Sequence, residues 1–323
     1  MRPILILTVS TWILTGTLLH ADVGDAKKRN SVKKAAAPDP GPGWGSLPLE
    51  FIYDGTPPIP DKIKPVRGAA LCGMFNIIDE ELLVDPKTKG IANVVVTLNH
   101  KRRELPKKLP PIVQNLAGNK VEMTNKACRF EPHVGVLWTE QTLVLSNKDS
   151  DVHNMLGNLV YNAPFNKVLQ PKAKPIEMKL KTAEKLARDV SCVIHPYMKG
   201  WLVVKDHPYA AVSSKLGQAT VAHLPEGTWE FQLWHEAVGY LSDIELNGKS
   251  VTGKKGIYKW EIKSETTKPL RIVVKEKVFA DFLERKKTQN NRSEQATNNR
   301  SYDRILFGAS PCQAVSLSHW DHR

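Results

Sequence analysis

The sequence has little cysteine and only one long hydrophobic run, and each shortage excludes a class of protein. Four Cys in 323 residues are too few for a disulfide-rich scaffold, and they lack the paired CxxC spacing of a structural zinc site. Beyond residues 3–19 no stretch approaches 18 apolar residues, so we expect no membrane span in the rest of the chain. The motifs GxGxxG, Walker A, HExxH and GxSxG are also absent.

The composition that remains is that of a folded protein with a basic surface. Hydrophobic residues make up 41% and charged residues 24% of the chain, which is enough for a packed core. Lys and Arg number 46 against 33 Asp and Glu, a net charge of +13 that favours acidic partners. The basic stretches lie in no known nucleic-acid-binding module, so we predict no nucleic-acid partner.

The N-terminal run indicates the compartment. Residues 3–19 are apolar, follow Arg2 and end near Leu19-His20-Ala21, which is typical of a signal peptide. We therefore predict a cleaved signal peptide over 1–21 and a periplasmic or otherwise exported protein, with an uncleaved anchor as the alternative. Residues 22–47 are rich in Lys, Pro, Gly and Ala, which predicts a flexible linker.

The body of the chain, residues 48–280, has the pattern of an all-β protein. Short runs with β-branched residues alternate with Gly, Pro and Asn, and only residues 181–188 resemble a helix. This predicts an antiparallel sandwich or barrel. Residues 281–323 are polar and patternless, which predicts a mostly disordered tail. The strand candidates are 49–55, 91–99, 134–140, 142–147, 200–207, 220–225, 228–235 and 270–279.

One short segment brings together three potential metal ligands. Cys192, His195 and Met198 fall within seven residues, and a thiolate, an imidazole and a thioether suit copper better than magnesium or calcium. A type 1 copper site needs a second imidazole, and His153 lies 39 residues before Cys192. Two alternatives stay open: an ordinary buried Cys with unrelated His residues, or a nucleophilic Cys-His pair, for which no orienting third group is evident.

The segment CVIHPYMKGWLVV resembles the ligand loop of amicyanin-type cupredoxins, which are small blue-copper proteins, and SNKDSDVHN resembles their segment with the first His ligand. The resemblance covers about residues 120–207. It implies a cupredoxin-like Greek-key β-sandwich that binds one type 1 copper and carries single electrons without being an enzyme. The ligands it implies are His153, Cys192, His195 and Met198, with Asn154 hydrogen-bonded to the ligand loop.

The same resemblance implies how such a protein meets its partners. His195 would be the ligand nearest the surface, and Pro196 and Tyr197 beside it would form an apolar docking patch. The partner would be another redox protein, such as a c-type cytochrome or a quinoprotein dehydrogenase.

A second resemblance begins where the first ends. Residues 207–245 resemble the transthyretin-like or carboxypeptidase-regulatory-like β-sandwich, and Asn93–Leu98 would be an early strand of that sandwich. Both patterns together resemble a methylamine-utilisation-like exported group. Because related modules accompany rhamnogalacturonan lyases, the alternative function is a non-redox interaction or carbohydrate-binding module. Such a module would expose Trp229, Trp234 and Tyr240 on one sheet face.

Two further cysteines are candidates for a disulfide. Cys192 belongs to the metal motif and Cys312 to the polar tail, which leaves Cys72 and Cys128. In an oxidising compartment we predict that these two pair, with two buried free thiols as the alternative.

Overall fold

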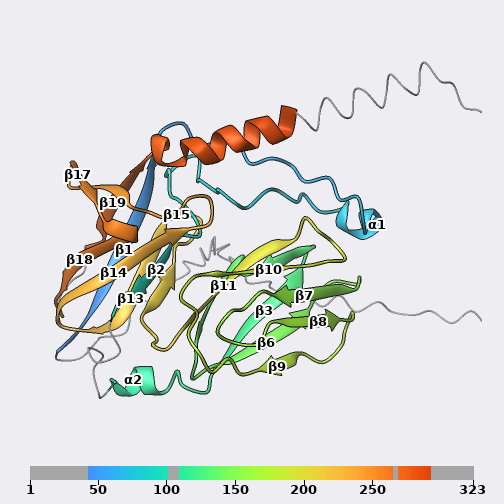
Figure 1. Cartoon of the computed structure of the whole chain (residues 1–323), viewed down its shortest axis with the longest axis horizontal. Coiled ribbons are helices and arrows are strands. Elements are labelled where there is room, and N and C mark those ends of the chain that lie inside the picture. The colour runs from blue at the N-terminus through green and yellow to red at the C-terminus, as the bar shows by residue number, and fades with distance from the viewer. Residues whose placement is uncertain (1–42, 101–108, 265–267, 292–323) are drawn as a thin grey trace, which may run out of the picture. The chain divides into compact units, whose positions relative to one another are not determined.

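The structure, a computed structural model of the chain, describes residues 43–100, 109–264 and 268–291. These residues belong to one compact unit and are almost entirely β, as the composition of the body predicts (Figure 1). The predicted signal peptide, residues 22–42 of the predicted linker, and Cys312 lie outside the described residues. Among the described residues, no helix is long and apolar enough to cross a membrane.

The first of two β-sandwiches is built from both ends of the described chain. One sheet has the strand order β13-β1-β19-β16-β17, and the other has the order β12-β2-β14-β15 with β18 paired to β14. Phe51 and Tyr53 on β1 and Phe231 and Leu233 on β14 are buried in the core that they share. The strands are β1 (Trp44–Asp54), β2 (Val95–Leu98), β12 (Ala210–Val212), β13 (Gln218–Pro225), β14 (Gly227–His235), β15 (Gly239–Tyr240), β16 (Asp243–Leu246), β17 (Lys249–Thr252), β18 (Ile257–Ile262) and β19 (Leu270–Lys275).

The second sandwich lies between β2 and β12 in the sequence, and we call it the inserted sandwich. Its sheets have the orders β5-β11-β10-β7-β8 and β4-β3-β6-β9. Because β2 pairs with β12, with Thr97 opposite Ala210, the chain leaves and re-enters the first sandwich on neighbouring strands. The strands are β3 (Lys120–Lys126), β4 (Arg129–Glu131), β5 (Val134–Trp138), β6 (Thr142–Asn147), β7 (His153–Gly157), β8 (Phe165–Leu169), β9 (Ile176–Met178), β10 (Arg188–Ser191) and β11 (Lys199–Lys205).

The two sandwiches contact each other through a small apolar cluster and a buried polar group. Trp201 of β11 packs edge-on against Trp234 of β14, with ring centroids 5.0 Å apart, and both side chains are half-buried against this cluster. The Glu236 carboxylate accepts a hydrogen bond from Trp201 Nε1 at 2.6 Å and lies 2.5 Å from His133 Nε2. A carboxylate from one sandwich thus binds two side chains of the other.

The exposed aromatic face that a carbohydrate-binding module would require is not formed. Side chains alternate along β14, so Trp229 and Trp234 lie on opposite faces of the strand. Trp229 packs against the core of the first sandwich, whereas Trp234 packs against the cluster between the sandwiches. Trp229, Trp234 and Tyr240 therefore do not share one face.

The predicted helix over residues 181–188 is wrong, because this segment is a loop that leads into β10. Its Glu184 is buried, and the carboxylate accepts hydrogen bonds from the backbone N–H groups of Val160, Tyr161 and Asn162. The three hydrogen bonds to this buried carboxylate stabilise the loop more than a two-turn helix would, because such a helix would bury little apolar surface.

The folded part of the chain also extends beyond both predicted ends of the body, residues 48 and 280. β1 begins at Trp44, inside the segment predicted as linker, because Leu47 and Leu49 are buried in the first core. Residues 280–291, at the start of the predicted disordered tail, form a helix after the 3-10 turn η2 (Glu276–Phe279). Phe282 packs that helix against the first core. The remaining short elements are α1 (Ala69–Cys72), α2 (Pro111–Gln114) and the 3-10 turn η1 (Lys254–Gly256).

Candidate metal centre

His153 is the first residue of β7, and its surroundings decide which ring nitrogen is available. Its side chain is fully buried, and Nε2 lies 3.0 Å from Oδ2 of Asp149. The other nitrogen, Nδ1, faces His195. A histidine whose outer nitrogen is held by a carboxylate has a fixed ring orientation, which is the usual arrangement at metal sites.

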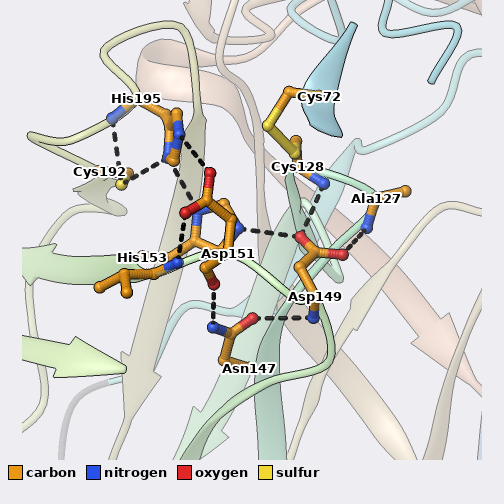
Figure 2. Close-up of a disulfide and its surroundings, with 10 residues drawn as sticks. Cys72, Ala127, Cys128, Asn147, Asp149, Asp151, His153, Cys192 and His195 are labelled. Carbon is orange, nitrogen blue, oxygen red and sulfur yellow. Dashed lines mark hydrogen bonds and ion pairs between the residues drawn. A yellow bond between two sulfur atoms is a disulfide. The ribbon is translucent and has the colours of Figure 1, made fainter. Parts of the chain in front are cut away.

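Asp149 is itself fixed by the turn that joins β3 to β4 (Figure 2). Its carboxylate accepts the backbone N–H groups of Ala127 at 2.7 Å and Cys128 at 2.9 Å. Both of these residues have left-handed backbones, with φ of 51° and 55°, which costs a non-glycine residue about 1–2 kcal/mol. The carboxylate therefore stabilises a costly turn and orients His153 at the same time.

Cys192, His195 and Met198 lie on the tight loop between β10 and β11. Met198 N–H donates to the His195 carbonyl at 2.9 Å, and Cys192 N–H donates to the Met198 carbonyl at 3.3 Å, so the loop closes on itself. Asn154 of β7 anchors it, because its Oδ1 accepts Val193 N–H at 2.8 Å. These are the contacts that we expected of Asn154.

Three of the four predicted ligands converge. His195 Nδ1 lies 3.0 Å from His153 Nδ1 and 3.8 Å from Cys192 Sγ. The ligand atoms of all three residues lie within 4.8 Å of one another, and each side chain is at most 1% exposed. Met198, the predicted axial ligand, is also buried in the same core.

The protonation states of this group are set by burial and by the hydrogen bonds within it. Burial opposes ionisation of Cys192, but hydrogen bonds from His153 and from backbone N–H groups outweigh it and lower the thiol pKa. Burial likewise opposes charge on His153, yet Asp149 and Cys192 raise its pKa to about 9. Burial and the positive charge of His153 lower the pKa of His195. Without a metal the group is a thiolate beside a protonated His153, and a metal ion would displace that proton. The resulting thiolate and two imidazoles are a donor set that fits copper or another borderline metal.

His195, which we expected to be the ligand nearest the surface, is as deeply buried as the other donors, whereas the docking patch of Pro196 and Tyr197 stays a prediction. Only 1% of His195 is exposed, because Gly68 of a distant segment lies against its ring. A Cβ atom on Gly68 would lie 2.4 Å from His195 Nε2, so only glycine fits there. Pro196 is exposed, but Tyr197 is half-buried and its hydroxyl group is shielded from solvent.

Cys72 and Cys128 form the predicted disulfide, with Cα atoms 5.6 Å apart. Both cysteines are fully buried, and Cys128 follows Ala127 in the turn held by Asp149. Figure 2 shows the disulfide beside the carboxylate that orients His153. Sequence reasoning missed Asp149 and Gly68. A carboxylate four residues before His153 was a possible signal for the first, whereas nothing local points to the second.

A second group of potential ligands, His100, Asp206 and His207, lies near the start of β12. His207 Nδ1 accepts the backbone N–H of Tyr209 at 3.1 Å, and burial lowers the pKa of this histidine to about 3. The ring is thus a neutral, hydrogen-bonded core histidine.

No family model matches the sequence, and no curated protein matches it. Part of the chain is similar to solved cupredoxins. Amicyanin from Paracoccus versutus is 14% identical over 34% of this chain and 97% of amicyanin, with a TM-score of 0.23. A purple cupredoxin from Nitrosopumilus maritimus is 20% identical over 27% of this chain and 99% of the cupredoxin, with a TM-score of 0.22.

A copper-containing nitrite reductase from Thermus scotoductus SA-01 is 18% identical over 33% of this chain, with a TM-score of 0.24. The matched part spans 25% of the reductase. The resemblance of residues 207–245 to transthyretin-like modules stays a prediction.

Proposed function

We propose that the chain binds one type 1 copper ion through Cys192 Sγ and the Nδ1 atoms of His153 and His195, with Met198 as a weak axial ligand. The observation that carries this proposal is the convergence of the three stronger donors within 4.8 Å in a buried site. When bound, copper would supply a one-electron couple between its two oxidation states. The proposed function is to carry single electrons, and the chain is not proposed to be an enzyme.

The residues around the donors favour electron transfer because they leave little freedom to rearrange. Asp149 fixes the ring of His153, and Asn154 fixes the ligand loop through its backbone N–H groups. Ligands that are held rigidly by hydrogen bonds and packing move little when the metal gains or loses an electron. The reorganisation energy of electron transfer is then small. Burial of all three donors also keeps bulk water away.

The proposal extends to where the protein acts and with what. The N-terminal residues 1–21 favour export to the periplasm. The net charge of +13 favours an acidic redox partner, such as a c-type cytochrome or a quinoprotein dehydrogenase.

The test is an absorption spectrum of the mature protein with saturating Cu(II), followed by a redox titration. We expect an intense thiolate-to-copper band that Cys192→Ser abolishes, because a hydroxyl oxygen cannot supply the sulfur charge transfer. Met198→Leu should keep the band and raise the potential, since losing a donor destabilises Cu(II) more than Cu(I). Met74→Leu, at a methionine that is 77% exposed, is the matched control and should change neither property. A wild type without the band, or a Cys192→Ser protein that keeps it, would refute the copper assignment.

A further inference from the structure

A short segment far from the ligand loop covers the metal centre. Residues 68–73, which we call the cover, contain α1 and begin at Gly68, whose left-handed φ of 66° turns the chain over the His195 ring. The carbonyl of Gly68 accepts the N–H of Cys72 at 2.8 Å, so the cover is one tight turn that ends at the disulfide.

The disulfide is the deepest anchor of residues 64–76, and Leu71 and Phe75 add half-buried contacts with the core of the inserted sandwich. Among residues 64–76, Cys72 is the one buried residue, whereas Val66 and Met74 are largely exposed. A helix of four residues cannot hold itself together in water. The position of the cover on His195 therefore depends largely on its covalent attachment to the inserted sandwich, since the packing of Leu71 and Phe75 is only partial.

The two ends of the disulfide act on different histidines. Cys72 lies four residues after Gly68, which contacts His195. Cys128 donates its backbone N–H to Asp149, which holds His153. One covalent bond thus links the supports of both imidazole ligands.

We propose that Gly68 and the Cys72–Cys128 disulfide are positioning elements that keep the metal centre closed. The cover excludes small anions from the metal and slows its loss, and breaking the disulfide opens the centre at His195. This inference rests on the proposed copper site. It predicts that the closed state depends on a segment outside the inserted sandwich.

The first experiment removes the disulfide in the full mature chain. A Cys72→Ala/Cys128→Ala double variant and the wild type, both loaded with Cu(II), are titrated with azide and separately mixed with excess EDTA. We expect the wild-type spectrum to be insensitive to azide. The double variant should bind azide and release copper faster, with a copper affinity lower by about 10–100-fold, the loss typical when the hydrogen-bond partners of metal ligands are removed.

The second experiment displaces the cover while the disulfide stays intact. In Gly68→Ala, the new methyl group would collide with the His195 ring, so azide should gain access as in the double variant. Gly118→Ala is the matched control, because Gly118 also has a left-handed φ, 79°, but its Cβ would meet nothing within 4 Å. The two glycine variants share the cost of a left-handed alanine, and they differ in the contacts that the Gly68 position makes with His195 and Asp151.

A third measurement needs no metal and keeps the inference testable apart from the proposed function. Cys192 is 1% exposed, so Ellman's reagent should modify it slowly in a Cys312→Ala background and faster once the disulfide or Gly68 is changed. A wild type that lacks the thiolate-to-copper band would refute the copper function alone. Equal azide access and equal Cys192 reactivity in wild type and both altered proteins would refute the cover.

Discussion

Replacing Asp149 with Asn is the substitution that most directly tests how the site is held. The Asp149 side chain is 5% exposed and receives hydrogen bonds from Ala127 N–H, Cys128 N–H and His153 Nε2. All three partners are donors, and a carboxylate has enough acceptor positions for them. An amide of the same size keeps one oxygen and directs an NH2 group at one of the donors.

The size of the effect follows from that mismatch. A hydrogen bond to a charged group contributes about 1.5–3 kcal/mol, and a buried donor left unpaired costs about 1–3 kcal/mol. Losing the charge and one partner should therefore lower the free energy of unfolding by about 2–4 kcal/mol. The loss comes from the left-handed Ala127–Cys128 turn and from the ring of His153, so the copper spectrum should change as well.

The assay is urea unfolding of the metal-free protein, compared with Asp85→Asn as the matched control. Asp85 also accepts two backbone N–H groups in a turn, those of Lys87 and Thr88, but these hydrogen bonds are exposed to water. Asn forms such exposed turns as readily as Asp, so the control should change the stability far less. If Asp149→Asn is no more destabilising than Asp85→Asn, the carboxylate does not hold the site together.

Three further predictions concern the rest of the fold. Burial lowers the pKa of His207 to about 3 and of His235 to about 4, so the unfolded chain binds more protons below pH 6.5. The free energy of unfolding should then fall by up to about 1.4 kcal/mol per pH unit for each histidine as the pH drops toward 4. In urea unfolding at several pH values, His235→Gln should remove the part of this pH dependence that His235 contributes. Glu184→Gln should speed hydrogen exchange at residues 160–162, whose backbone N–H groups the carboxylate binds. Glu236→Gln weakens the buried contact with Trp201 and should separate the unfolding of the two sandwiches, as followed by tryptophan fluorescence.

Features that depend on residues close together in the sequence were predictable. Three ligand types within seven residues indicated the metal loop, and the structure brings Cys192 and His195 together with His153. Alternation and turn residues located eight of the nineteen strands in the described residues, since a side-chain period of two is a local property. The disulfide followed from counting the cysteines that had no other role.

Features that depend on distant contacts were not predictable. The burial of His195 comes from Gly68, which is 127 positions away, and no local pattern reveals that contact. The boundary between the sandwiches depends on the pairing of Thr97 with Ala210 across 113 positions. The pattern over 181–188 did indicate a helix, but the carboxylate of Glu184 instead accepts backbone N–H groups of another loop. In each case tertiary contacts outweighed the local preference.

The metal centre belongs to both sandwiches, although its ligands lie on only one of them. The cover comes from the connection between β1 and β2 of the first sandwich, and the disulfide fastens it to the β3–β4 turn of the inserted one. The same connection is held farther along, where Lys286 of the C-terminal helix pairs with Asp79 at 2.5 Å and with Glu81 at 2.8 Å. Because a four-residue helix has no stability of its own, the closure of the site over His195 requires these attachments. The inserted sandwich supplies the donors, and the connection from the first sandwich decides whether solvent reaches them.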